Sequence, residues 1–181
     1  MASFGCGSFY TEDMSAERDG HHGPVIGIDL GTTNSLVAIC DERGPRVIAD
    51  ADGSRLMPSV VRFGEDEQLV VGEEARREAI THASRTVSSA KRLFGRSLEE
   101  LAAAERRASF QLVAGPRGVC AIDLGDRVVT PQEVAAHILG ALRQRARRHW
   151  GVRSNVRWSL CQPTSTTPSG RRRVMLDDWL V

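Results

Sequence analysis

Alternation of apolar and polar residues begins abruptly near position 25. Two apolar runs, residues 25–30 and 35–40, flank the short polar segment 31–34, which reads GTTN. Two strand-like runs separated by a turn of this composition predict a β-hairpin with its tip at residues 31–34.

Shorter apolar runs continue the pattern. Those bounded by Gly, Pro or Asp predict strands at residues 46–49, 59–63, 68–71, 110–114 and 119–124. Runs with helical spacing predict helices at residues 72–80, 84–94 and 98–107.

The strongest helix signal covers residues 131–150. Thr130 can cap its N-terminus, Pro131 suits the first helical position, and Glu133 completes a capping box. Gly151 is placed to end the helix. One apolar stripe runs along it: Val134, Ile138, Leu139 and Leu142. Strands first, with helices mixed in afterwards, predict an α/β fold.

Residues 1–23 show no periodicity, and we interpret them as a disordered extension. The whole chain is 41% hydrophobic and 26% charged, as in globular proteins. No apolar run reaches the roughly 20 residues of a membrane helix, and the start lacks the blocks of a signal peptide. We therefore expect a cytoplasmic protein that engages no membrane.

Charge and cysteine usage exclude other classes. The net charge of +1 gives no electrostatic case for nucleic-acid binding, and we expect the basic cluster at residues 143–148 to be a solvated helix face. The four cysteines form no CxxC pair, which argues against a zinc site or a redox motif. The pair His21-His22 could touch a metal, but a solvated tail explains it more simply.

Lysine usage singles out one position. Of the 24 lysine and arginine residues, only Lys91 is a lysine. Either it survived by chance in an arginine-rich chain, or position 91 requires a compact ammonium group in place of a planar guanidinium.

The hairpin tip carries candidate chemistry. A glycine and two threonines between strands can present backbone N–H groups and hydroxyls to an anion, and Asp29 is a hard oxygen ligand for Mg²⁺ or its waters. An ordinary turn is the alternative. The chain contains neither GxxxxGK[ST] nor GxGxxG, so any phosphate site belongs to another class.

The segment DLGTTNS resembles the first phosphate loop of the actin-like ATPases. Within that superfamily, the DnaK-type, seventy-kilodalton heat-shock chaperones are matched by four further segments, in order and spacing: DGSRLMPSVVRF, VGEEAR, SAKRLFGR and TPQEVAAHILGALRQRARRHWG. The resemblance covers about 130 residues, roughly 24–153. It implies a partial actin-like (ribonuclease H-like) ATPase domain consisting of the first lobe.

The resemblance also implies roles for individual residues. Gly31, Thr32 and Thr33 would hold the β- and γ-phosphates of ATP, and Asp29 would face the hydration shell of Mg²⁺. Lys91 and Asp29 would be the catalytic residues, since the family's lysine reaches the γ-phosphate and the attacking water and its aspartate faces the hydrated metal. The intact parent would hydrolyse ATP and bind ADP, unfolded client peptides, a J-domain co-chaperone and a nucleotide-exchange factor during the stress response.

Residues 154–181 depart from the family, which continues with a buried strand, a VPAYF-like turn and a helix. Neither strand nor helix period is present there, so we expect an unstructured tail. Codons can be written for residues 154–181, with any third base that the genetic code permits, and then read from one nucleotide earlier. The new text is VERAVVT for 154–160, VPAYFDDAQR for 161–170 and QATRDAGRLAG for 171–181. Our hypothesis is the loss of one nucleotide near Arg153.

Three interpretations of function stay open. The chain is an ATP-binding fragment of a chaperone, a non-functional product of a frameshifted gene, or a non-catalytic module that binds co-chaperones. In each case the chain alone is expected to lack measurable ATP turnover, because the family's second phosphate loop and adenosine pocket follow downstream.

Overall fold

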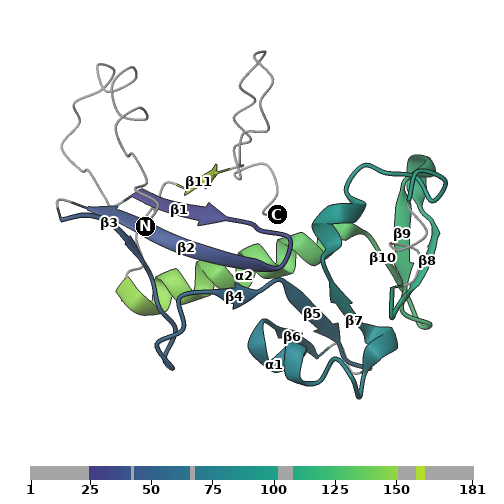
Figure 1. Ribbon diagram of the computed structural model, residues 1–181, viewed down its shortest axis with the longest axis horizontal. Coiled ribbons are helices and arrows are strands. Elements are labelled where there is room, and N and C mark those ends of the chain that lie inside the picture. The colour runs from purple at the N-terminus through teal and green to yellow at the C-terminus, as the bar shows by residue number, and fades with distance from the viewer. Residues whose placement is uncertain (1–24, 42, 66–67, 102–107, 151–157, 162–181) are drawn as a thin grey trace, which may run out of the picture.

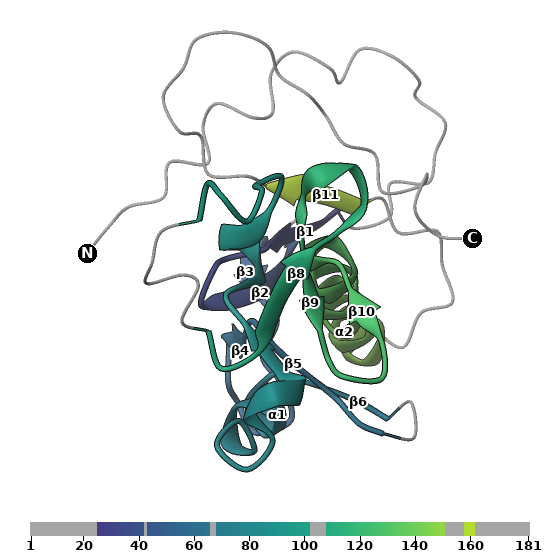
Figure 2. The ribbon, with the colours of Figure 1, turned by 90° about the vertical axis from the view of Figure 1, so that its right-hand side faces the viewer.

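The computed structural model describes residues 25–41, 43–65, 68–101, 108–150 and 158–161. These form a mixed α/β structure with three small sheets and one long helix, as Figures 1 and 2 show from two directions. The expected extension at residues 1–23 lies outside the described residues.

The hairpin expected at the start of the pattern is confirmed. Strand β1 (Val25–Asp29) pairs antiparallel with β2 (Asn34–Asp41), and Asp29 lies opposite Leu36 beside the tip. Strand β3 (Gly44–Val47) continues the sheet, slightly earlier than the expected 46–49, and the short β4 (Met57–Pro58) pairs with the tip end of β2.

The fifth strand of the first sheet corrects the expectation for residues 154–181. We expected residues 154–181 to contain no regular structure, but β11 (Trp158–Cys161) pairs in parallel with β1. Parallel pairing requires a crossover connection, and the long helix supplies it. The pairing uses main-chain groups along the edge of β1, so it does not depend on side-chain alternation. The other residues of the segment lie outside the described part.

The second sheet has the order β6-β5-β7. It comprises β5 (Val60–Phe63), β6 (Leu69–Val71) and β7 (Thr86–Ser88). Helix α1 (Glu73–Arg77) follows β6 and is shorter than the expected 72–80.

The helix expected at residues 84–94 is wrong. That stretch consists of the 3₁₀ turn η2 (Ala83–Arg85), strand β7 and the 3₁₀ turn η3 (Ala90–Leu93). Val87 is fully buried where β7 pairs with β5, so sheet pairing overrides the helical spacing. Ser89 then adopts a φ of 56°, which prevents helix continuation. Of the helix expected at residues 98–107, only 98–101 are described, as turns and a bend.

The third sheet confirms the two later strand predictions. Strand β8 (Gln111–Ala114) pairs with β9 (Cys120–Asp123) across the turn η4 (Pro116–Gly118), and β9 pairs with β10 (Val128–Val129).

Arg85 connects the second and third sheets. Its guanidinium donates to the carbonyl oxygens of Phe63 (2.8 Å), Gly64 (2.8 Å) and Leu124 (3.3 Å). It also makes two hydrogen bonds to the carboxylate of Asp126, at 2.9 and 3.0 Å. One planar side chain therefore fixes the ends of two strands to each other.

Helix α2 (Pro131–Trp150) has the expected bounds and the expected capping box. The N–H of Glu133 donates to Thr130 Oγ1 (3.2 Å), and the Thr130 N–H donates to the Glu133 carboxylate (2.5 Å). Its buried stripe includes Val134, Ile138 and Leu142, while Leu139 is partly buried. The helix runs beside all three sheets in Figure 1, so its stripe forms the centre of the core.

We expected the whole basic cluster on α2 to be solvated, but one of its arginines is buried. Arg145 is 5% exposed, and its guanidinium lies 2.8 Å from the carboxylate of Asp50. The loop that carries Asp50 reaches the helix, so the buried guanidinium of Arg145 is paired with a carboxylate. Among the described residues, no helix is long and apolar enough to cross a membrane.

Candidate functional site

The tip of the first hairpin is built around Gly31. A Cβ atom at this position would lie 2.0 Å from the carbonyl oxygen of Asn34, so the turn accepts only glycine. Asp29, Thr33 and Asn34 are exposed, and Gly31 and Thr32 are partly so. The tip therefore presents two threonines in succession at the surface.

Two buried serines support the tip from below. The N–H of Gly31 donates to Ser35 Oγ (3.2 Å), and Ser59 Oγ donates to the carbonyl oxygen of Gly31 (2.9 Å). The two hydroxyl oxygens lie 2.8 Å apart. The Ser59 N–H further donates to the carbonyl oxygen of Thr33 at 2.9 Å.

The donors of the tip differ in whether they already have a partner. The N–H of Gly31 is bonded to Ser35 Oγ. By contrast, the hydroxyls of Thr32 and Thr33 make no hydrogen bond to any described residue, so they are available to a ligand. Sequence reasoning missed Ser35 and Ser59, although each is a polar residue within an apolar run.

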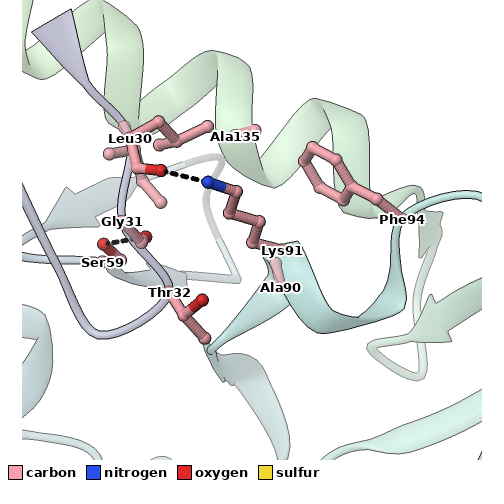
Figure 3. A pocket seen from close by; sticks show the side chains of 9 residues that line it. Leu30, Gly31, Thr32, Ser59, Ala90, Lys91, Phe94 and Ala135 are labelled. Atoms are coloured by element: carbon pink, nitrogen blue, oxygen red, sulfur yellow. Dashed lines mark hydrogen bonds between the residues drawn. The ribbon is translucent and has the colours of Figure 1, made fainter. Parts of the chain in front are cut away.

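Lys91 reaches the tip from a distant part of the chain. It lies on η3, packed beside α2, and its Nζ donates to the carbonyl oxygen of Leu30 at 2.8 Å. Figure 3 shows the side chain extending toward the tip, with Ala135 of α2 above it. A small pocket there is lined by Leu30, Gly31, Thr32, Ser59, Ala90, Lys91, Phe94, Ala135 and Ile138. The expectation that Lys91 lies near the tip is confirmed.

An ammonium group carries three N–H donors. The structure gives Lys91 one acceptor, the carbonyl of Leu30, among the described residues. Two donors are therefore free to bind an anionic oxygen beside Thr32.

A larger cleft of about 310 Å³ also adjoins the tip. Hydroxyl side chains dominate its wall, together with one cation. Its lining is Thr32, Thr33, Asn34, Pro58, Ser59, Val60, Arg76, Ala79, Thr86, Ser88, Ser89 and Ser109. Thr32 and Ser59 line both hollows, so a ligand on the threonines would lie close to Lys91 and to the cleft.

Asp29 is at the end of β1, exposed, and lines neither hollow. Within the described ranges, no group of three or more His, Cys, Asp or Glu side chains gathers that could enclose a metal ion. A lone exposed carboxylate suits a hydrated Mg²⁺, which keeps several of its waters, better than a closed protein cage.

The chain is similar to known proteins over most of its length. The family model described as "Hsp70 protein" matches residues 25–156. Chaperone protein dnaK1 of Synechococcus elongatus is 42% identical over 129 residues, which are 71% of this chain and 20% of the relative. Chaperone protein DnaK 3 of a Synechococcus species matches with the same identity and coverage. The chain thus spans about a fifth of the length of these relatives.

Proposed function

Because the chain belongs to the Hsp70 family, we propose that its tip and Lys91 form the first-lobe half of a Mg-ATP site in an actin-like ATPase domain. The observation that carries the proposal is the contact between Lys91 Nζ and the carbonyl of Leu30 (2.8 Å), which sets a cation beside Thr32. An ammonium and two unengaged hydroxyls are a suitable donor set for a polyphosphate.

Each residue has a distinct proposed role. Thr32 and Thr33 donate to the β- and γ-phosphate oxygens, and Gly31 permits the turn that exposes them. Asp29 accepts hydrogen bonds from the waters of Mg²⁺. The metal, when bound, neutralises charge on the phosphates.

Lys91 is the proposed catalytic residue. Its two free N–H donors would contact the γ-phosphate, where negative charge develops as the phosphoryl group is transferred. Its existing bond to Leu30 holds the ammonium in place before the nucleotide arrives. A fixed donor needs no reorganisation during the reaction, and this is the basis of its effect on rate.

For a chain of the relatives' full length, we propose ATP-dependent protein folding in the cytoplasm, with client peptides, a J-domain co-chaperone and a nucleotide-exchange factor as partners. The present chain is proposed to hold nucleotide through its phosphates alone. Without the remainder of the site, we expect no measurable turnover.

A titration followed by ¹H–¹⁵N nuclear magnetic resonance tests this proposal. Mg-ATP and Mg-triphosphate should both shift the amide signals of Thr32, Thr33 and Lys91, whereas adenosine should not. Signals from the third sheet, such as that of Val113, serve as the internal control. If ATP leaves the tip signals unchanged at millimolar concentration, the proposal is wrong.

A further inference from the structure

We propose that Ser35 and Ser59 are positioning residues for the phosphate-binding tip, a role that rests on the proposed function. They touch no phosphate themselves. Instead, they set the orientation of two successive peptide units, so that the donors of the tip face outward before a ligand binds.

The direction of every hydrogen bond in the cluster is fixed by chemistry. A backbone N–H can only donate and a carbonyl can only accept, and each serine hydroxyl has one proton. Ser59 uses its proton on the Gly31 carbonyl, so Ser35 must give its own to Ser59 Oγ. A closed ring results, from the Gly31 N–H through both hydroxyls back to the Gly31 carbonyl.

The ring orients the peptide units on both sides of Gly31. The Leu30–Gly31 unit is held at its N–H by Ser35 and at its carbonyl by Lys91 Nζ. The next unit is held at the Gly31 carbonyl by Ser59, and its N–H belongs to Thr32. The serines therefore fix both the carbonyl on which the ammonium docks and the direction of the next donor.

Burial distinguishes this role from direct binding. Ser35 is 1% exposed and Ser59 is 3% exposed, and both hydroxyl protons are already committed to the ring. Hydrogen bonds within a buried chain strengthen one another, and a buried polar atom that loses its partner destabilises the folded protein. The ring is therefore rigid, and it has no donor left for a ligand.

The segment that carries β4 and Ser59 extends the support of the tip. Ser35 pairs with Met57 across the short β2–β4 ladder, and the Ser59 N–H holds the carbonyl of Thr33. The tip is thus attached to a second segment of chain, 24 positions from Ser35, and Figure 3 shows Ser59 against Gly31.

The test uses the whole chain and the variants Ser35→Ala, Ser59→Ala and the double variant, with Ser54→Ala as the control. Ser54 carries an exposed hydroxyl that bonds the carbonyl of Leu56, away from the tip. Amide hydrogen exchange without ligand is measured first. The Gly31 N–H should be protected in the unsubstituted chain, and its exchange should accelerate about tenfold or more in the serine variants.

The affinity for Mg-ATP is measured next, from the shifts of the Thr32 and Thr33 amides. Each serine variant should bind about tenfold more weakly, with Leu142 amide exchange in the core unchanged and Ser54→Ala equal to the unsubstituted chain. A Gly31 N–H that exchanges freely in the unsubstituted chain overturns the proposal, and this measurement needs no variant to fold.

The remaining outcomes separate the two proposals. Normal ATP binding with unchanged affinity in the serine variants overturns the positioning role alone. Absence of ATP binding by the unsubstituted chain overturns the proposed function, and the positioning role with it, even where Gly31 is protected.

Discussion

The Nζ atom of Lys91 lies 2.8 Å from the carbonyl oxygen of Leu30, although 61 positions separate the two residues. The contact places the only lysine of the chain beside the hairpin tip. A flexible ammonium can share its donors between a carbonyl and a phosphate, which a planar guanidinium does less readily. If the proposed function is correct, this contact gives a physical reason for a lysine at position 91.

Removing this ammonium should affect hydrolysis more than binding. In a chain of the relatives' full length, we expect Lys91→Ala to lower the rate constant of ATP hydrolysis by about 10²-fold or more. The dissociation constant for Mg-ATP should change by less than about tenfold, because Thr32 and Thr33 still hold the phosphates. Single-turnover hydrolysis and equilibrium binding measure the two quantities.

Arg92→Ala is the matched control for Lys91, because it removes an exposed cation from the next position. Its hydrolysis rate should stay within about twofold of the unsubstituted chain. Equal losses in both variants would show that general positive charge, and not the placement of Lys91, supports the reaction.

Substitution of Gly31 should disrupt the tip. The Cβ atom of Gly31→Ala would meet the backbone oxygen of Asn34 at 2.0 Å, so the hairpin must rearrange. We expect the free energy of unfolding to fall by about 2 kcal/mol or more in urea titrations. Gly140→Ala is the control, because nothing lies within 4 Å of its Cβ and α2 should gain about 0.5–1 kcal/mol. A Gly31 variant as stable as the original would contradict the geometry.

The ion pair between Asp50 and Arg145 should respond asymmetrically to mutation. Asp50→Ala leaves a buried guanidinium without its carboxylate and should lower the free energy of unfolding by about 2 kcal/mol. Arg145→Met leaves only a carboxylate that is 38% exposed and can be hydrated, so its effect should be below about 1 kcal/mol.

A double-mutant cycle checks this pair. The variant that combines both changes should be more stable than Asp50→Ala alone, because no unpaired charge stays buried. Strictly additive effects would mean that the two side chains do not interact.

His137 should make stability depend on pH. Burial lowers the pKa of this imidazole from 6.5, Glu133 opposes the shift and Arg127 adds to it, so the folded state favours the neutral ring beside Phe63. The stabilisation is complete above the unfolded pKa of 6.5 and is lost as the pH falls through the lower folded pKa.

Urea titrations between about pH 7.5 and pH 5.5 measure this effect. The free energy of unfolding should decrease on acidification, and His137→Gln should weaken that decrease because glutamine does not titrate. His82→Gln, which removes another histidine, is the control. An unchanged pH dependence in His137→Gln would refute the assignment.

The reading-frame hypothesis predicts what resequencing near Arg153 will find. One additional nucleotide should restore the text VERAVVTVPAYF from position 154, with valine at positions 158, 159 and 161. Those positions fall on β11, where β-branched residues favour strand pairing with β1. A locus whose frame is intact and whose codons cannot yield that text would end the hypothesis.

Local patterns in the sequence determined the elements whose stability is local. The hairpin followed from two apolar runs around GTTN, and α2 followed from its capping box and stripe, because turn geometry and helical period involve residues close in the chain. Both segments were also among the five that carry the resemblance to the family, and the first contains the tip.

Tertiary structure decided what depends on distant partners. Segment 84–94 has helical spacing, yet pairing with β5 turns part of it into a strand, and Arg145 is buried because Asp50 reaches it across 95 positions. The Ser35–Ser59 ring likewise joins residues that no periodicity relates. Such contacts arise from packing in three dimensions. The pattern along the chain shows which residues are apolar or polar, but not which of them will be in contact in the folded protein.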